Sequence, residues 1–178
     1  MLRRGLLTGR AVALAGPPPA AIGQALIELG ARVLELDSEL DEDGARDWAA
    51  AAAPLHALLY DAGSQFADGG GSDALRESLE RAWVATRAVA TGALIPAGAG
   101  KVVLLAPPAG AAFAAAARAA LENLVRTLSV EWARYGVSAV AVAPGAATRD
   151  DELAELVCFL VSEAGEYFDG CLFELAAG

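Results

Sequence analysis

The residues best placed for chemistry are two glycines and an aspartate near the N-terminus. Gly16 follows an apolar run, Gly23 lies inside a segment that predicts a helix, and Asp37 ends a second apolar run. A glycine after a strand lets the backbone approach a pyrophosphate, and an acidic residue about 20 positions further on can bind a ribose hydroxyl. The spacing therefore predicts a dinucleotide site with Gly16, Gly23 and Asp37 as its contacts.

The turn that follows Gly16 weakens this prediction. It consists of Pro17, Pro18 and Pro19, and proline has no backbone N–H to donate to a phosphate. Loops that hold phosphates do so with such N–H groups. We therefore expect the site to be vestigial at most, with no bound cofactor and with Asp37 as a solvated surface residue.

The other candidate side chains favour structural roles. His56, the only histidine, lies within an apolar run, which favours a hydrogen-bonded structural histidine over a base or a ligand. Cys158 and Cys171 also lie in apolar segments, without histidine or cysteine partners at metal-ligand spacing. The sequence thus predicts reduced thiols and no metal site.

The elements that would position these residues alternate along the chain. Apolar runs predict strands over 11–15, 32–36, 55–60, 101–106, 137–143 and 171–175, and periodic segments predict helices over 20–29, 47–53, 73–94, 112–135 and 150–162. We expect residues 38–46, which are polar and acidic, to form a surface loop. The alternation predicts an α/β protein: a Rossmann-like, doubly wound parallel sheet of about six strands with helices on both faces, in one domain over residues 1–178.

The charge and the hydropathy of the chain exclude several classes of binding partner. The net charge is −10, from 13 basic and 23 acidic residues, and no basic stripe is present to neutralise phosphates. This argues against nucleic acid and anionic membranes as partners. No apolar run reaches the roughly 18 residues that a membrane-spanning helix needs. Together with the reduced thiols, these features predict a cytoplasmic protein.

Several segments, in chain order, resemble the short-chain dehydrogenase/reductase (SDR) family. They are the opening unit 11–37, the turn Tyr60-Asp-Ala-Gly63, the strand at 100–106, the segment 119–145 that ends in Pro-Gly, and the closing segments 159–164 and 168–178. Each piece is weak alone, but the ordered series covers nearly the whole chain. The resemblance implies a Rossmann fold and NAD(P)-dependent redox chemistry, in which an Asn-Ser-Tyr-Lys set moves the proton.

That catalytic set has no counterpart in this chain. The serine position falls on Ala106 or Pro107, the tyrosine position on Ala114 and the lysine position on Arg118. Alanine has no proton to give, and a guanidinium stays charged at any working pH. The family also carries an extra strand and helix between Asp37 and Leu55. We therefore expect a truncated, degenerate member with no catalytic residues.

Three functions follow from this resemblance. The main interpretation is a pseudoenzyme, not an enzyme on its own, that acts as a structural or regulatory subunit. It would pair with an active SDR paralogue as a heteromer, or with itself as a dimer, through helices 73–94 and 112–135, because the alanines at 111–120 allow close helix packing. The alternative is an active NAD(P)-dependent oxidoreductase with relocated catalytic groups, for which Asp61, Tyr135 and Arg118 are candidates. A module that binds another small ligand in the crevice of the sheet is the third.

Overall fold

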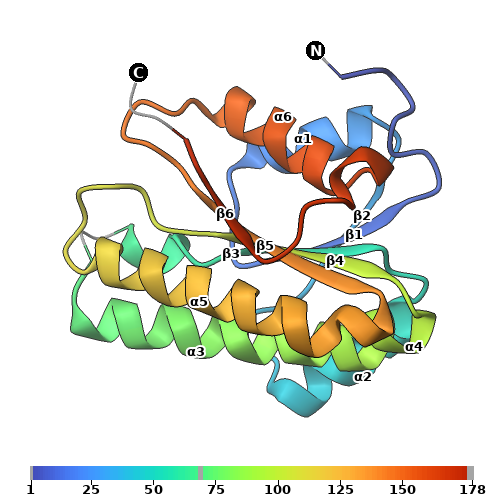
Figure 1. Cartoon of the computed structure of the whole chain (residues 1–178), viewed down its shortest axis with the longest axis horizontal. Helices are drawn as coiled ribbons and strands as arrows, with labels where there is room; N and C mark the ends of the chain where they lie inside the picture. The colour runs from blue at the N-terminus through green and yellow to red at the C-terminus, as the bar shows by residue number, and fades with distance from the viewer. Residues whose placement is uncertain (1, 68–69, 176–178) are drawn as a thin grey trace.

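A six-stranded parallel sheet with the order β2-β1-β3-β4-β5-β6 runs through the molecule (Figure 1). The computed structural model describes residues 2–67 and 70–175. The strands are β1 (Ala11–Ala15), β2 (Arg32–Glu35), β3 (Ala57–Asp61), β4 (Gly100–Leu105), β5 (Val137–Ala143) and β6 (Cys171–Glu174). The predicted fold class is confirmed.

The central strands are apolar along their whole length because both faces of the sheet are covered. Alternate residues of a strand point to opposite faces. In β4, Val102 and Leu104 contribute to one core, and Val103 and Leu105 to the other. The edge strands β2 and β6 are only partly buried. A continuous apolar run is therefore typical of the inner strands of this sheet.

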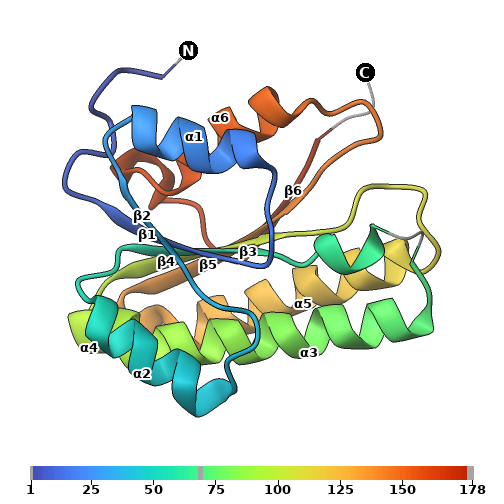
Figure 2. The ribbon, with the colours of Figure 1, turned by 180° about the vertical axis from the view of Figure 1, so that it is seen from behind.

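Helices cover the two faces unequally (Figure 2). One face carries α1 (Ala20–Glu28) and α6 (Asp150–Leu160), which pack against each other. The other face carries α2 (Glu42–Ala52), α3 (Ser72–Val89) and α5 (Ala114–Trp132). The predicted helix 73–94 is α3 extended by a π-helical turn, Ala90–Leu94, before the short α4 (Ile95–Ala97). The helices therefore close a core on each side of the sheet.

The loop predicted over residues 38–46 is wrong in its second half, because α2 begins at Glu42. The side chain of Asp41 accepts a hydrogen bond from the backbone N–H of Gly44 at 2.8 Å and so caps the helix. Glu42 and Asp43 then stand in the first turn, where negative charge is favourable. In the described chain, α2 is the only regular element between β2 and β3.

Within the described residues, no helix has both the length and the apolar character required to cross a bilayer.

Candidate functional site

A cavity of about 370 Å³ opens at the carboxyl ends of β1, β2 and β3. Here β1 pairs with β2 on one side and with β3 on the other. The connection after β1 leads to α1 on one face of the sheet, and the connection after β3 leads to α3 on the other face. Open α/β sheets bind ligands at such a switch point. The cavity walls include Gly16, Asp37, Tyr60, Arg76, Glu77, Glu80 and Arg81.

Gly16 lies where β1 comes closest to the end of β3. Its φ is +64°, and a Cβ atom built on it would lie 2.5 Å from the backbone oxygen of Asp61. Only glycine fits such a position without displacing the backbone. Gly23, the second predicted contact, lies elsewhere: it faces the side chain of Leu14 from within α1 and does not line this cavity. The structure thus brings together two of the three predicted contacts, Gly16 and Asp37.

The carboxylate of Asp37 lies at the rim of the cavity. Its Oδ1 accepts a hydrogen bond from the backbone N–H of Glu39 at 2.9 Å, which fixes its orientation. No ion pair involving Asp37 occurs among the described residues. Asp37 therefore presents an oriented, uncompensated negative charge.

The basic side chains of the cavity wall are paired with carboxylates. Arg81 contacts Glu77 at 2.7 Å and Glu39 at 3.8 Å, and Arg76 contacts Glu80 at 3.4 Å. Asp37, Glu77 and Glu80 outnumber Arg76 and Arg81 in the described cavity wall, so the wall carries a net negative charge. Hydroxyl donors suit such a cavity better than a phosphate does.

The proline turn leaves part of the expected phosphate site intact. Pro19 is the N-cap of α1, and the helix begins at Ala20. The first N–H groups of a helix have no partner inside it, so the N–H groups of Ala20 and Ala21 remain available at this end. Proline just before a helix removes donors from the turn, but it leaves those of the first helical turn in place.

Two of the positions matched to the family's catalytic set meet at the ends of β4 and β5. Arg118 donates a hydrogen bond from Nε to the carbonyl oxygen of Pro107 at 2.9 Å, and another from Nη2 to the carbonyl oxygen of Pro144. Ala114 lies one turn earlier on α5 and is buried. Arg118 is thus the one side chain of these positions that carries a polar group.

Asp61 is a buried titratable group at the carboxyl ends of the strands. It ends β3, is 8% exposed and accepts a hydrogen bond on Oδ1 from the backbone N–H of Gly63 at 2.8 Å. Burial raises the pKa of its carboxyl to about 6, although hydrogen bonds from the backbone of Gly63 and Ser64 oppose this shift. Tyr135 lies outside the site: it follows α5 directly before β5 begins, and the guanidinium of Arg134 covers its ring.

We expect Asp61→Asn to stabilise the protein above pH 6. Because the pKa of Asp61 is raised from 3.8 to about 6, the folded state keeps its proton while the unfolded state loses it, and stability falls between these pH values. The loss is about 3 kcal/mol at most, at 1.36 kcal/mol per pKa unit. Urea denaturation at pH 4 and pH 8 measures it: the advantage of the variant should be small at pH 4 and full at pH 8. An advantage that does not change with pH would contradict the shift.

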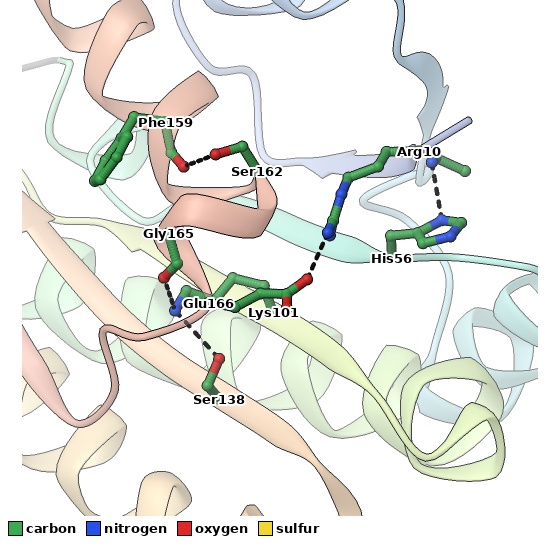
Figure 3. A network of polar contacts seen from close by, with 9 residues as sticks. Arg10, His56, Lys101, Ser138, Phe159, Ser162, Gly165 and Glu166 are labelled. Carbon is green, nitrogen blue, oxygen red and sulfur yellow. Dashed lines mark hydrogen bonds and ion pairs between the residues drawn. The ribbon is translucent and has the colours of Figure 1, made fainter. Parts of the chain in front are cut away.

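A structural network of polar contacts lies at the amino ends of the strands, opposite the cavity (Figure 3). Nδ1 of His56 accepts a hydrogen bond from the backbone N–H of Ala11 at 3.0 Å, as expected for a structural histidine. Lys101 is 1% exposed, and its Nζ donates to Ser138, Gly165 and Phe168. This network ties the segment around Gly165 to the strands.

Both cysteines are free, Cys158 in the core and Cys171 partly buried. Across the described ranges, histidine, cysteine and acidic side chains form no cluster that could hold a metal ion.

No protein-family model and no curated protein matches this sequence, but many solved structures share its fold. A short-chain dehydrogenase/reductase of Serratia marcescens has a TM-score of 0.74 at 20% identity, covering 96% of this chain and 97% of its own. BdcA in complex with NADPH has a TM-score of 0.73 at 18% identity, over 96% and 94%. A gluconate 5-dehydrogenase from Burkholderia cenocepacia in complex with NADP and tartrate has a TM-score of 0.72 at 18% identity, over 97% and 95%. The chain thus has the SDR fold.

These neighbours contradict two expectations. The prediction that no cofactor is used is wrong by this comparison, since structures of the same fold hold NADP and NADPH. The prediction that the chain is not an enzyme on its own is contradicted as well, because neighbours of the same architecture are named dehydrogenases. The physical reason lies in the site: the prolines leave the cavity, Gly16 and the first turn of α1 in place. Truncation and loss of the catalytic set stay predictions.

Proposed function

We propose that this protein binds NAD at the carboxyl edge of its sheet and acts as an oxidoreductase on a small substrate. The observation that carries the proposal is the cavity at the β1–β3 switch point, where Gly16 and Asp37 meet. Its place in the fold is where open α/β sheets bind nucleotides. Neighbours of the same fold that hold NADP or NADPH support the proposal.

Asp37 favours NAD over NADP. A carboxylate at the end of the second strand accepts hydrogen bonds from ribose hydroxyls, and its charge repels a 2′-phosphate. Arg76 and Arg81 are the basic residues of the cavity wall, and both are paired with carboxylates. Among the described residues that line the cavity, no uncompensated cation is thus left for a 2′-phosphate.

Asp61 is our candidate for proton transfer. The nicotinamide, when bound, gives or takes the hydride. A general acid or base works best when its pKa lies near the working pH, and the pKa of Asp61 is raised to about 6. Carbonyl reduction needs the protonated carboxyl, so it should weaken as the pH rises through 6. Alcohol oxidation needs the carboxylate and should strengthen over the same range.

The binding test is a fluorescence titration of the full chain with NADH and with NADPH. We expect saturable NADH binding, and we expect Asp37→Asn to weaken it roughly 10-fold to 100-fold, since a hydrogen bond to a charged group contributes about 1.5–3 kcal/mol. NADPH binding should weaken far less or improve, because the repelling charge is gone.

Asp47→Asn is the matched control, because it removes an exposed aspartate of α2 that does not line the cavity. It should bind NADH as the unmodified chain does. Absence of saturable binding of either dinucleotide would refute the proposal, and so would equal losses in the two variants.

The pairing of helices 73–94 and 112–135 with a second SDR-fold subunit is part of the same proposal. The exposed apolar side chains Trp83 on α3 and Val130 on α5 support it. Sedimentation of the purified chain, alone and mixed with an SDR paralogue, tests it. The cytoplasmic location likewise stays a prediction.

A further inference from the structure

Arg118 is a partly buried cation for which the described part of the chain supplies no carboxylate partner. Among the arginines of the described chain, Arg10, Arg46 and Arg81 are also partly buried, and each forms an ion pair with a carboxylate. Arg118 forms none with the described residues, where its hydrogen bonds go to the carbonyl oxygens of Pro107 and Pro144. These oxygens orient the guanidinium but carry no net charge. A charge removed from water is costly unless it is paired, so this position favours an anion.

The guanidinium keeps donors for such an anion. An arginine side chain has five N–H groups in a planar fork, and the contacts to Pro107 and Pro144 use two of them. The fork matches a carboxylate, which can accept two parallel hydrogen bonds. The same edge holds the start of α5 at Ala114, whose N-cap residue Phe113 makes no side-chain capping bond. A helix start adds positive potential there.

Arg118 lies on α5 and contacts the segments that follow β4 and β5, so an anion bound to it would be separate from the dinucleotide cavity. Pro107 follows β4 and Pro144 follows β5, whereas Gly16 follows β1. Since β3 lies between β1 and β4, and neighbouring strands are about 4.8 Å apart, β4 lies roughly 10 Å from β1. Arg118 is also absent from the cavity wall. Arg118 therefore lies at the carboxyl ends of β4 and β5, beside the proposed dinucleotide site, where a substrate could bind.

We infer that Arg118 binds the carboxylate of the substrate, and that the substrate class is a small hydroxy acid or its keto form. This inference rests on the proposed function and names its substrate class. A monoanion fits better than a doubly charged phosphate, because one guanidinium supplies one positive charge in a protein of net charge −10. The contact with Arg118 would hold the carboxylate end of the substrate at the carboxyl ends of β4 and β5, beside the strand that ends in Asp61.

Calorimetric titration with gluconate and with glucitol tests the inference. The two probes share a six-carbon polyol chain, and only gluconate carries a carboxylate. We expect the full chain in the presence of NADH to bind gluconate at least 10-fold more tightly than glucitol. Arg118→Gln should lose this preference and keep its NADH affinity. Arg126→Gln should keep both, because Arg126 is exposed on the same helix and pairs with Glu122.

The outcomes separate this inference from the proposed function. NADH binding without any preference for gluconate would overturn the carboxylate site and leave the dinucleotide site standing. Equal gluconate binding by Arg118→Gln and the unmodified chain would also overturn it, as would tighter binding of inorganic phosphate than of gluconate. If Arg118→Gln does not fold, the inference is tested with Arg118→Lys and with the two probes on the unmodified chain. The lysine variant keeps the charge but loses the planar fork. It should therefore keep a reduced preference for gluconate over glucitol.

Discussion

Replacing Gly16 by alanine is expected to lower the free energy of unfolding by about 2–5 kcal/mol and to abolish NADH binding. The φ of +64° at this residue costs an L-amino acid about 1–2 kcal/mol. The added Cβ would also lie 2.5 Å from the backbone oxygen of Asp61, and relieving such overpacking costs about 1–3 kcal/mol. Relief requires β1 and β3 to separate at the point where the cavity forms. Urea denaturation and NADH fluorescence measure the two effects.

Gly98→Ala is the matched control for this substitution. Gly98 has a φ of +69°, close to that of Gly16, but a Cβ atom there would meet nothing within 4 Å. It follows α4, far from the cavity wall. We expect only the conformational cost of about 1–2 kcal/mol and unchanged NADH binding. Equal losses of stability in the two variants would show that the contact with Asp61 is unimportant.

The strands could be predicted from the sequence because the sheet is covered on both faces. The run at 11–15 is β1 with the same bounds, and the run at 137–143 is β5. Buried parallel strands are continuously apolar, so the pattern and the structure coincide. The start of α2 was missed for the opposite reason. Its first turn is acidic and contains no apolar residue, and the helix depends on the cap at Asp41 and on packing against α3.

The candidate site could be predicted only in part. Gly16 and Asp37 could be predicted because they follow the two parallel strands of one βαβ unit, which brings them to the same end of the sheet. Arg76 and Arg81 line the cavity from α3, a helix that is distant from Gly16 and Asp37 in the sequence. How this helix packs against the sheet is not encoded by any local pattern. The proline turn predicted that no cofactor is bound, and this prediction is wrong. The prolines remove the donors of the turn, whereas the first turn of α1 keeps its own N–H donors.

Replacing Lys101 by alanine is expected to lower the free energy of unfolding by about 3–5 kcal/mol, although this residue lies far from the proposed site. Lys101 is 1% exposed, and its ammonium donates to the carbonyl oxygen of Gly165 and to the hydroxyl of Ser138 (Figure 3). It also donates to the carbonyl oxygen of Phe168. Alanine leaves a cavity and deprives two carbonyl groups of their donor. Each unsatisfied buried group costs about 1–3 kcal/mol, and the cavity adds to this loss. Urea denaturation at pH 7 measures the change.

Lys101→Met separates the contribution of the hydrogen bonds from that of the cavity, because methionine restores most of the volume but donates no hydrogen bond. We expect this variant to lose about 2–3 kcal/mol, less than alanine, if the bonds to Gly165 and Phe168 dominate. A methionine variant as stable as the unmodified chain would show that burial of the ammonium costs as much as its hydrogen bonds contribute. NADH binding should be unchanged in both variants, because the lysine lies at the amino end of β4 and the cavity at the carboxyl ends of β1 to β3. A loss of NADH affinity in a folded Lys101 variant would mean that the two edges of the sheet are coupled.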